Sequence, residues 1–175
     1  MKYSDLIFQW LKECGFTHCY FVAGGNIMHL LNSARQSMTC IPVVNEVAAV
    51  IATEYHNATL NSLEKINING KAITLVTAGP GLTNTITGFA GAWLESRELL
   101  VLGGQVKVKD LAPQGLRQLG IQEIDGVALT SSISKKSVCL KETISRDEFI
   151  KLISHSWMDR KGPVFIELPL DLQAK

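Results

Sequence analysis

The sequence lacks a surplus of either sign of charge. Seventeen basic residues balance sixteen acidic ones over 175 residues, and charged residues make up only 19% of the chain. Proteins that bind nucleic acids or anionic membranes usually concentrate positive charge on one face or segment. The charge balance therefore argues against nucleic acid and membrane partners and leaves small molecules and other proteins as expected partners.

Paired cysteines and long apolar runs are also missing. The four cysteines form no Cys-x-x-Cys pair, no histidine stands at zinc-finger spacing, and no signal peptide precedes them. These absences argue against a disulfide-stapled secreted domain and against a zinc site, so we expect reduced thiols in a cytoplasmic protein. No apolar run reaches the roughly 18 residues that a membrane-spanning helix needs.

The apolar content, in contrast, is high for a chain of this length. Hydrophobic residues make up 46% of the sequence, which is typical of a globular domain and not of a disordered segment. A chain of this size suits one domain with a well-buried core. We expect residues 1–175 to form a single domain, with part of the apolar surplus lying in an interface.

Short β-rich runs alternate with helix-length segments along the chain. This alternation predicts an α/β fold: one doubly wound domain with an about six-stranded, mostly parallel sheet and helices on both faces. The expected strands cover residues 18–22, 41–44, 72–76, 99–102, 133–140 and 164–168. The expected helices begin near residues 4, 26, 45, 82 and 146, and the polar segment 60–71 is expected to be an exposed connection.

Two glycines fall inside the fourth expected helix. Gly88 and Gly91 each weaken a helix by about 1 kcal/mol relative to alanine. Their presence predicts a close helix contact at both positions that has no room for a side chain.

Glu46 follows a buried strand and opens an alanine-rich helix. Because the helix dipole alone favours a glutamate there, the position fits a structural role as well as a functional one. Two glycine-rich turns also follow expected strands, one at residues 23–26 and one at residues 77–84. Open α/β sheets bind ligands at the carboxyl ends of their strands, but neither turn has the dinucleotide-binding pattern or a phosphate loop with its lysine.

The ordered set of motifs is more specific than any single one. In sequence order the chain carries Ala23-Gly24-Gly25, Asn45-Glu46, Thr77 to Asn84, Gly104-Gln105, Gln122-Glu123-Ile124-Asp125 and Gly162-Pro163-Val164. This order resembles the N-terminal, pyrimidine-binding domain of thiamine-diphosphate-dependent decarboxylases and synthases, in particular the acetolactate-synthase-like enzymes. The resemblance covers nearly the whole chain.

The resemblance implies roles for individual residues and a reaction. Glu46 matches the catalytic glutamate that hydrogen-bonds the N1′ atom of the cofactor's aminopyrimidine ring and thereby activates the cofactor. Gln122 matches a position near the substrate. The matching cofactor-binding positions are Val22, Gly24, Gly25, Pro80 and Asn84. The implied reaction is decarboxylation of a 2-keto acid such as pyruvate with carbon–carbon bond formation, by a lyase or transferase.

The motif that holds the other end of the cofactor is not in this sequence. In the family a second domain binds Mg²⁺ and the diphosphate through Gly-Asp-Gly and later asparagines, and no such motif occurs here. We therefore expect thiamine diphosphate to contact this chain through its pyrimidine end only, Mg²⁺ to be held by the absent domain, and the chain alone to be inactive. The central domain is absent as well, and whether it carries FAD stays open.

The resemblance also implies partners. The site would be completed by the diphosphate-binding domain of the same or another subunit, in a homodimer or homotetramer. Either the chain is part of a longer protein, or the missing domains form a separate subunit. A noncatalytic binding or assembly module that kept the fold is the alternative function, and the retention of Glu46 argues against it.

One departure from the family pattern lies next to the catalytic position. Asn45 stands where the family usually has a histidine that faces the reacting centre. Glu46 itself is kept. The departure leaves the acceptor substrate undetermined.

Overall fold

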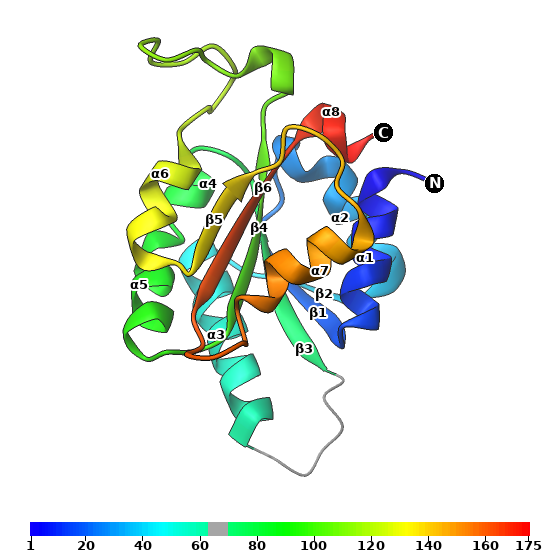
Figure 1. The fold of residues 1–175 in the computed structure, drawn as a ribbon, viewed down its shortest axis with the longest axis vertical. Coiled ribbons are helices and arrows are strands. Elements are labelled where there is room, and N and C mark those ends of the chain that lie inside the picture. Colours follow the sequence, from blue (N-terminus) through cyan, green and yellow to red (C-terminus); the bar gives the residue numbers. More distant parts are fainter. Residues whose placement is uncertain (63–69) are drawn as a thin grey trace.

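The structure is a computed structural model, and it describes residues 1–62 and 70–175. Within these residues, six strands form one sheet in the order β2-β1-β3-β4-β6-β5, and every neighbouring pair is parallel (Figure 1). The strands are β1 Phe16–Phe21, β2 Thr39–Pro42, β3 Lys71–Val76, β4 Leu99–Gln105, β5 Lys136–Cys139 and β6 Pro163–Pro169. The predicted α/β class with a six-stranded parallel sheet is confirmed.

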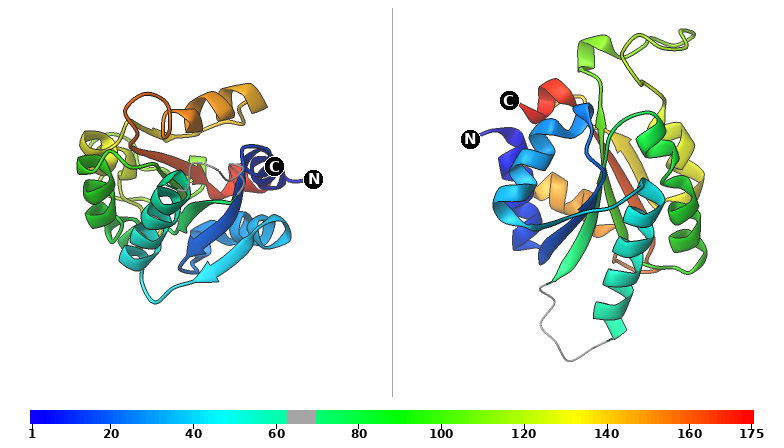
Figure 2. Two further views of the ribbon diagram at one scale, coloured as in Figure 1. Left: turned by 90° about the horizontal axis from the view of Figure 1, so that it is seen from below. Right: turned by 180° about the vertical axis from the view of Figure 1, so that it is seen from behind.

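Helices connect these strands and cover both faces of the sheet. They are α1 Tyr3–Glu13, α2 Met28–Ser37, α3 Glu46–Ser62, α4 Pro80–Thr83, α5 Ile86–Leu94, α6 Gly126–Thr130, α7 Arg146–Ser154 and α8 Leu170–Gln173. Helices α1, α2, α7 and α8 lie together on one face, while α3, α5 and α6 lie on the other (Figure 2). The doubly wound arrangement is therefore confirmed.

The alternation of side chains along the central strands divides the interior into two cores. Leu100 and Leu102 of β4 pack in the core beneath α1 and α7, whereas Leu99 and Val101 pack in the core beneath α3 and α5. Successive residues of a strand point to opposite faces, so a strand buried on both sides is apolar at most of its positions. This explains why the central strands read as long, mostly apolar runs.

Several element boundaries differ from the predicted ones. Strand β2 lies two residues earlier than expected, and the prediction that the strand before Glu46 is buried is wrong, because β2 forms an edge of the sheet and has no buried residue. Strand β5 is shorter than expected because residues 131–133 form a 3-10 turn. The predicted connection 60–71 also needs correction, because α3 continues to Ser62 and β3 begins at Lys71. The rest of that connection, residues 63–69, lies outside the described residues.

The fourth predicted helix is two helices. Thr85 accounts for the break between α4 and α5, since its hydroxyl donates a hydrogen bond of 2.6 Å to the carbonyl of Leu82, and its backbone N–H donates to the same carbonyl at 2.8 Å. Local side-chain bonds of this kind compete with the regular helical pattern. The break turns the chain so that α5 can run along α3.

The glycine prediction is confirmed at Gly88 and wrong at Gly91. A Cβ atom added at Gly88 would overlap the Val50 side chain of α3, with its Cβ atom at 2.8 Å. At Gly91 the nearest atom to an added Cβ is an Oε2 atom of Glu54 at 3.7 Å, which is an ordinary contact. Close approach of α3 and α5 therefore requires glycine at one position only.

The strand order creates a point where neighbouring connections diverge. From β1 the chain moves to the edge strand β2 and then returns past β1 to form β3 on its other side. The turns that follow β1 and β3 consequently lead to opposite faces of the sheet. Open α/β sheets bind ligands at such a point, beyond the carboxyl ends of the strands.

Within residues 1–62 and 70–175, no helix has the length and apolar character needed to cross a membrane.

Candidate functional site

Glu46 lies at the carboxyl end of the sheet, at the start of α3. Asn45 immediately precedes the helix, and its side-chain oxygen accepts a hydrogen bond of 2.9 Å from the backbone N–H of Ala48. This is the hydrogen bond of a helix cap, and it fixes the direction in which the helix begins. Glu46 is the first helical residue, and only 8% of it is exposed. Asn45, which stands where the family usually has histidine, thus acts as the cap of the helix that carries Glu46.

The carboxylate of Glu46 meets the turn that follows β3. Its Oε2 atom accepts a hydrogen bond of 2.9 Å from Nδ2 of Asn84, a residue 38 positions later in the chain. A Cβ atom added at Gly81 would lie 3.4 Å from the Oε1 atom of Glu46. The same Cβ atom would overlap Cγ2 of Thr77 at 2.8 Å, so only glycine fits between Thr77 and the Oε1 atom of Glu46.

The turns after β1 and β3 lie against each other. The backbone N–H of Asn26 donates a hydrogen bond of 3.3 Å to the hydroxyl of Thr77. A Cβ atom added at Gly24 would overlap the Thr77 side chain. Gly79 adopts a φ of +68°, a left-handed conformation that glycine accepts without steric cost. The two glycine-rich turns singled out in the sequence are therefore neighbours in space.

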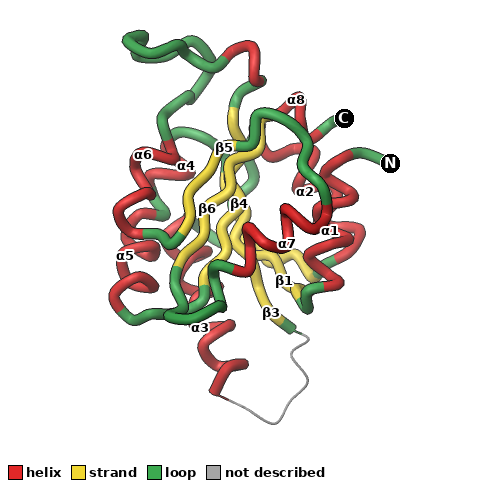
Figure 3. Tube along the Cα trace, in the orientation of Figure 1, coloured by secondary structure: helices red, strands yellow, loops and turns green. Residues whose placement is uncertain are grey.

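Gln122 reaches the same edge from a long connection after β4. Its backbone oxygen would lie 2.7 Å from a Cβ atom added at Gly79, and its own φ is +60°. Its side chain is exposed. The connection rises above the upper end of the sheet in the tube drawing (Figure 3).

The structure thus brings Glu46, Asn84, Gly24 and the backbone of Gln122 to one edge of the sheet. Val22 lies one residue beyond β1 and is half-buried, Gly25 is exposed with open space where a side chain would be, and Pro80 is the exposed first residue of α4. Among the described residues, no hydrogen bond joins these three, or the side chain of Gln122, to Glu46. Their predicted contacts with a cofactor stay predictions.

The arrangement fits the pyrimidine end of thiamine diphosphate. Among the described residues, the Oε1 atom of Glu46 has no hydrogen-bond donor, while Oε2 is held by Asn84. A carboxyl oxygen that the protein leaves without a donor can hydrogen-bond a ring nitrogen. Val44, two residues before Glu46, is 92% exposed, and Ile121, next to Gln122, is 82% exposed. Exposed apolar side chains therefore accompany the polar groups in these segments, a mixture that ligand sites commonly have. In the part of the chain that the structure describes, no three metal-ligating side chains of His, Cys, Asp or Glu come together.

Fold and site together define an open α/β domain that binds a ligand at the carboxyl edge of its sheet. Residues 1–129 match the model of the family described as thiamine pyrophosphate enzyme, N-terminal TPP binding domain. This match covers most of the chain, so the chain belongs to that family. Thiamine pyrophosphate is another name for thiamine diphosphate, and the predicted family is thereby confirmed.

Curated relatives carry the name acetolactate synthase. The chain is 30% identical over 174 residues to the acetolactate synthase large subunit of Lactococcus lactis subsp. lactis and 32% identical over 175 residues to the catabolic acetolactate synthase of Raoultella terrigena. Each alignment covers 97% of this chain and 28% of the relative. It is also 36% identical over 103 residues, or 57% of this chain and 17% of the relative, to the isozyme 3 large subunit of Escherichia coli. The chain thus spans less than a third of the length of these relatives.

One residue of this edge was not singled out from the sequence. Glu167 lies in the buried strand β6 and is only 3% exposed, and it lines a cavity of about 600 Å³ together with Gln105, Asp125 and Cys139. Burial raises the pKa of Glu167 to about 7, although hydrogen bonds from Gln105 and Cys139 oppose the rise. Burial and the neighbouring Glu167 raise the pKa of the Cys139 thiol to about 12. The signal in the sequence was a glutamate inside an otherwise apolar strand, which no solvent-facing position explains.

Proposed function

We propose that this chain supplies the pyrimidine-binding half of a thiamine-diphosphate enzyme of the acetolactate synthase type, acting on a 2-keto acid such as pyruvate. The observation that carries the proposal is the buried carboxylate of Glu46, with one oxygen held by Asn84 and the other, beside Gly81, without a hydrogen-bond donor among the described residues. The family match and the names of the relatives support the same activity.

Each residue of the site has a task in this proposal. Glu46 shares a proton with the N1′ atom of the pyrimidine ring through its Oε1 atom. Asn84 keeps the carboxylate in the orientation that this hydrogen bond needs. Gly24 and Gly25 let the backbone approach the flat ring closely, and Val22 and Pro80 give the ring apolar contacts. Gln122 stands on the side from which the keto acid would approach.

The cofactor, when bound, would supply a nucleophilic carbon for the reaction with the keto acid. Glu46 would hydrogen-bond the N1′ atom and hold the proton that its carboxyl group shares with this nitrogen, which is its part in activating the cofactor. The diphosphate and Mg²⁺ would be held by a separate domain that supplies hard oxygen ligands. We propose that this domain belongs to the same or another subunit of a homo-oligomer, and that a central domain holds FAD if the enzyme uses it.

The test is the exchange of the cofactor's C2 proton in the complete cofactor-binding assembly. Glu46→Gln keeps the size of the side chain and an oxygen that Asn84 can bind, but it removes the acidic group that shares a proton with N1′. We expect the exchange rate to fall by at least about a hundredfold, within the range attributed to a positioned acid or base. Exchange of the proton for deuterium in deuterated buffer, stopped by acid after set times, can be followed by NMR.

The matched control is Glu95→Gln, the same chemical change at an exposed residue that ends α5. This variant should exchange at the parent rate, and circular dichroism should report the parent fold for both variants. Parent-like exchange in Glu46→Gln would remove Glu46 from its role and would favour the noncatalytic binding or assembly module.

A further inference from the structure

Gln105 is the last residue of β4 and is 2% exposed. Its Nε2 atom donates two hydrogen bonds, one of 3.1 Å to Oε1 of Glu167 and one of 3.0 Å to the backbone oxygen of Ile124. Its Oε1 atom accepts a hydrogen bond of 2.9 Å from the backbone N–H of Val106. One buried amide group therefore joins the end of the sheet to a segment that lies 19 residues further along the chain.

Glu167 fixes the orientation of that amide group. It lies opposite Gly103 in the pairing of β4 with β6, two residues before the end of the strand. Its carboxyl group packs against Gly126, where an added Cβ atom would overlap Oε1. Because Glu167 is rigidly held inside the sheet, it can fix the direction in which Gln105 donates.

The segment that Gln105 reaches is the Gln122 loop, residues 111–125. Within it, the carboxylate of Glu123 accepts backbone hydrogen bonds from Ala112 at 2.5 Å, from Leu119 at 2.9 Å and from Gly120 at 2.9 Å. Burial alone would raise the pKa of Glu123, but these three donors together hold it below the ordinary value. These hydrogen bonds hold separate parts of the loop to the carboxylate of Glu123, so the loop forms a unit that is stabilised by its own contacts.

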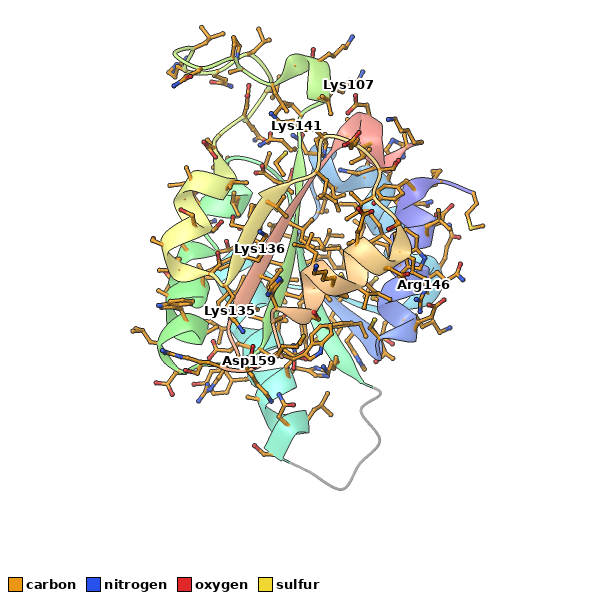
Figure 4. All side chains as sticks on the ribbon, in the orientation of Figure 1. Lys107, Lys135, Lys136, Lys141, Arg146 and Asp159 are labelled. Atoms are coloured by element: carbon orange, nitrogen blue, oxygen red, sulfur yellow. The ribbon has the colours of Figure 1, made fainter. Side chains whose placement is uncertain are left out.

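Contacts between this unit and the rest of the domain include the side chain of Ile124, which packs against the core beneath α3 and α5. Gly120 packs against the Val106 side chain, the backbone of Gln122 packs against Gly79, and Gln105 binds the carbonyl of Ile124. Lys107, labelled at the top of Figure 4, follows Gln105 by two residues and marks where the chain leaves the sheet. The hydrogen bond to Ile124 lies two residues from Gln122, so it restrains the position of that residue directly.

We propose that Gln105 and Glu167 are positioning residues, which hold the Gln122 loop against the turn of residues 77–84 and thereby place Gln122 beside Glu46. The substrate-facing role of Gln122 rests on the proposed function. The attachment of the loop does not, because it is a property of this chain without any cofactor. The two parts can therefore be tested separately.

The first experiment measures backbone hydrogen exchange of the 175-residue chain by NMR or mass spectrometry. Gln105→Met keeps the length of the side chain but removes both donated hydrogen bonds. We expect exchange of the Leu119, Gly120 and Glu123 amides to accelerate about tenfold, as loss of one net hydrogen bond's stabilisation from a local opening predicts. Exchange of the β3 amides should stay at the parent rate.

The matched controls separate positioning from general stability. Gln114→Met makes the same change at an exposed position of the same loop and should leave all rates unchanged. Glu167→Gln keeps an oxygen that can accept from Gln105 and should leave the loop protected. Unchanged loop exchange in Gln105→Met, or an equal acceleration throughout β3, would overturn the role of Gln105. Glu167→Met removes that oxygen and should accelerate loop exchange as Gln105→Met does, and unchanged loop exchange in Glu167→Met would overturn the role of Glu167.

The second experiment uses the complete enzyme assembly. Gln105→Met should lower kcat about tenfold while the dissociation constant of thiamine diphosphate changes less than about twofold, because Glu46 and the turns that bind the ring are untouched. An equal loss of cofactor affinity would indicate a merely structural role and would overturn the proposal. If the assembly bound no cofactor at all, the proposed function would fail, while the exchange result on the chain would still decide how the loop is attached.

Discussion

Glu46 and Glu167 are both buried at the carboxyl edge of the sheet, but their surroundings differ. Glu46 begins a helix and receives one hydrogen bond from Asn84, and its other oxygen has no hydrogen-bond donor among the described residues. Glu167 lies inside a strand among Gln105, Cys139 and the acidic side chains of Asp125 and Glu123. At the residue scale, the two carboxyl groups therefore differ in position. Glu46 lies beyond the end of a strand, where it can meet a ligand, whereas Glu167 lies within a strand, where it binds other groups of the protein.

Glu167 gives a stability prediction that depends on pH. The pKa of its carboxyl group is about 7 in the folded chain and 4.5 in an unstructured one. Between these values the folded state binds more protons than the unfolded state, so the contribution of Glu167 to stability falls as pH rises from 4.5 to 7 and is constant above 7. Glu167→Gln replaces the ionisable carboxyl group with a neutral amide and therefore removes this loss of stability. We expect the free energy of unfolding to rise by up to about 3 kcal/mol at pH 8 and to change little at pH 4.5.

Urea unfolding at the two pH values, followed by circular dichroism, measures this difference. The control is Glu142→Gln, the same change at an exposed residue, which should shift the free energy of unfolding by less than about 0.5 kcal/mol at either pH. A Glu167→Gln variant that gained no stability at pH 8 relative to pH 4.5 would show that the carboxyl group is ionised without penalty.

At the element scale, the contact between α3 and α5 determines where the helix that begins with Glu46 lies. Gly88 of α5 packs on Val50 of α3, and Glu54 of α3 binds Arg97 just after α5 at 3.0 Å. Burial raises the pKa of Glu54 although the Arg97 guanidinium opposes the rise. The first turn of α3 holds Glu46, so a shift of α3 against α5 would move the carboxylate relative to Asn84.

Alanine substitutions at Gly88 and Gly91 of α5 test this contact, because only the first one places an atom into α3. Gly88→Ala places a Cβ atom into the Val50 side chain, so we expect a loss of about 1–3 kcal/mol in the free energy of unfolding despite the better helix propensity of alanine. Gly91→Ala meets no close atom and should gain roughly 0.5–1 kcal/mol. Equilibrium urea unfolding of both variants gives the comparison, and equal effects of one sign would contradict the assigned contact.

At the scale of the whole molecule, the chain presents one edge of the sheet that carries half of a binding site in the proposed function. The residues proposed to bind the cofactor and the Gln122 loop lie there, and Val44 and Ile121 are exposed apolar residues in the neighbouring segments. The relatives are more than three times as long as the region that aligns with this chain. The geometry of this edge suits closure by a second domain that holds the charged end of the cofactor.

Calorimetry with thiamine diphosphate and Mg²⁺ tests this division. We expect the chain by itself to bind at least about a hundredfold more weakly than an assembly that includes the diphosphate-binding domain, because the phosphate and metal contacts supply much of the binding free energy. The control titration uses thiamine, which lacks the diphosphate and should show a much smaller difference. Equal affinity of thiamine diphosphate for both samples would contradict the proposed half-site.

The sequence by itself determined the class of fold and the first candidate residue. Unbroken apolar β-rich runs separated by helix-length segments require strands buried on both faces, because only a covered parallel sheet keeps such side chains from water. The ordered set of motifs in the sequence likewise singled out Glu46, because an acidic residue at a helix start by itself fits a structural role equally well. The sequence predicted the ends of helices and strands less well. An example is Thr85, where the hydrogen bond of a single hydroxyl interrupts the helical pattern.

Tertiary structure alone decided which distant residues meet. Glu46 and Asn84 are 38 residues apart, and Gln105 and Glu167 are 62 residues apart, so their hydrogen bonds depend on the order of strands in the sheet and on how each connection crosses it. Whether a glycine is needed at Gly88 but not at Gly91 depends equally on which atoms of α3 face α5. Such contacts arise from the arrangement of elements in space, which periodicity and composition do not specify, because many arrangements bury the same apolar faces equally well.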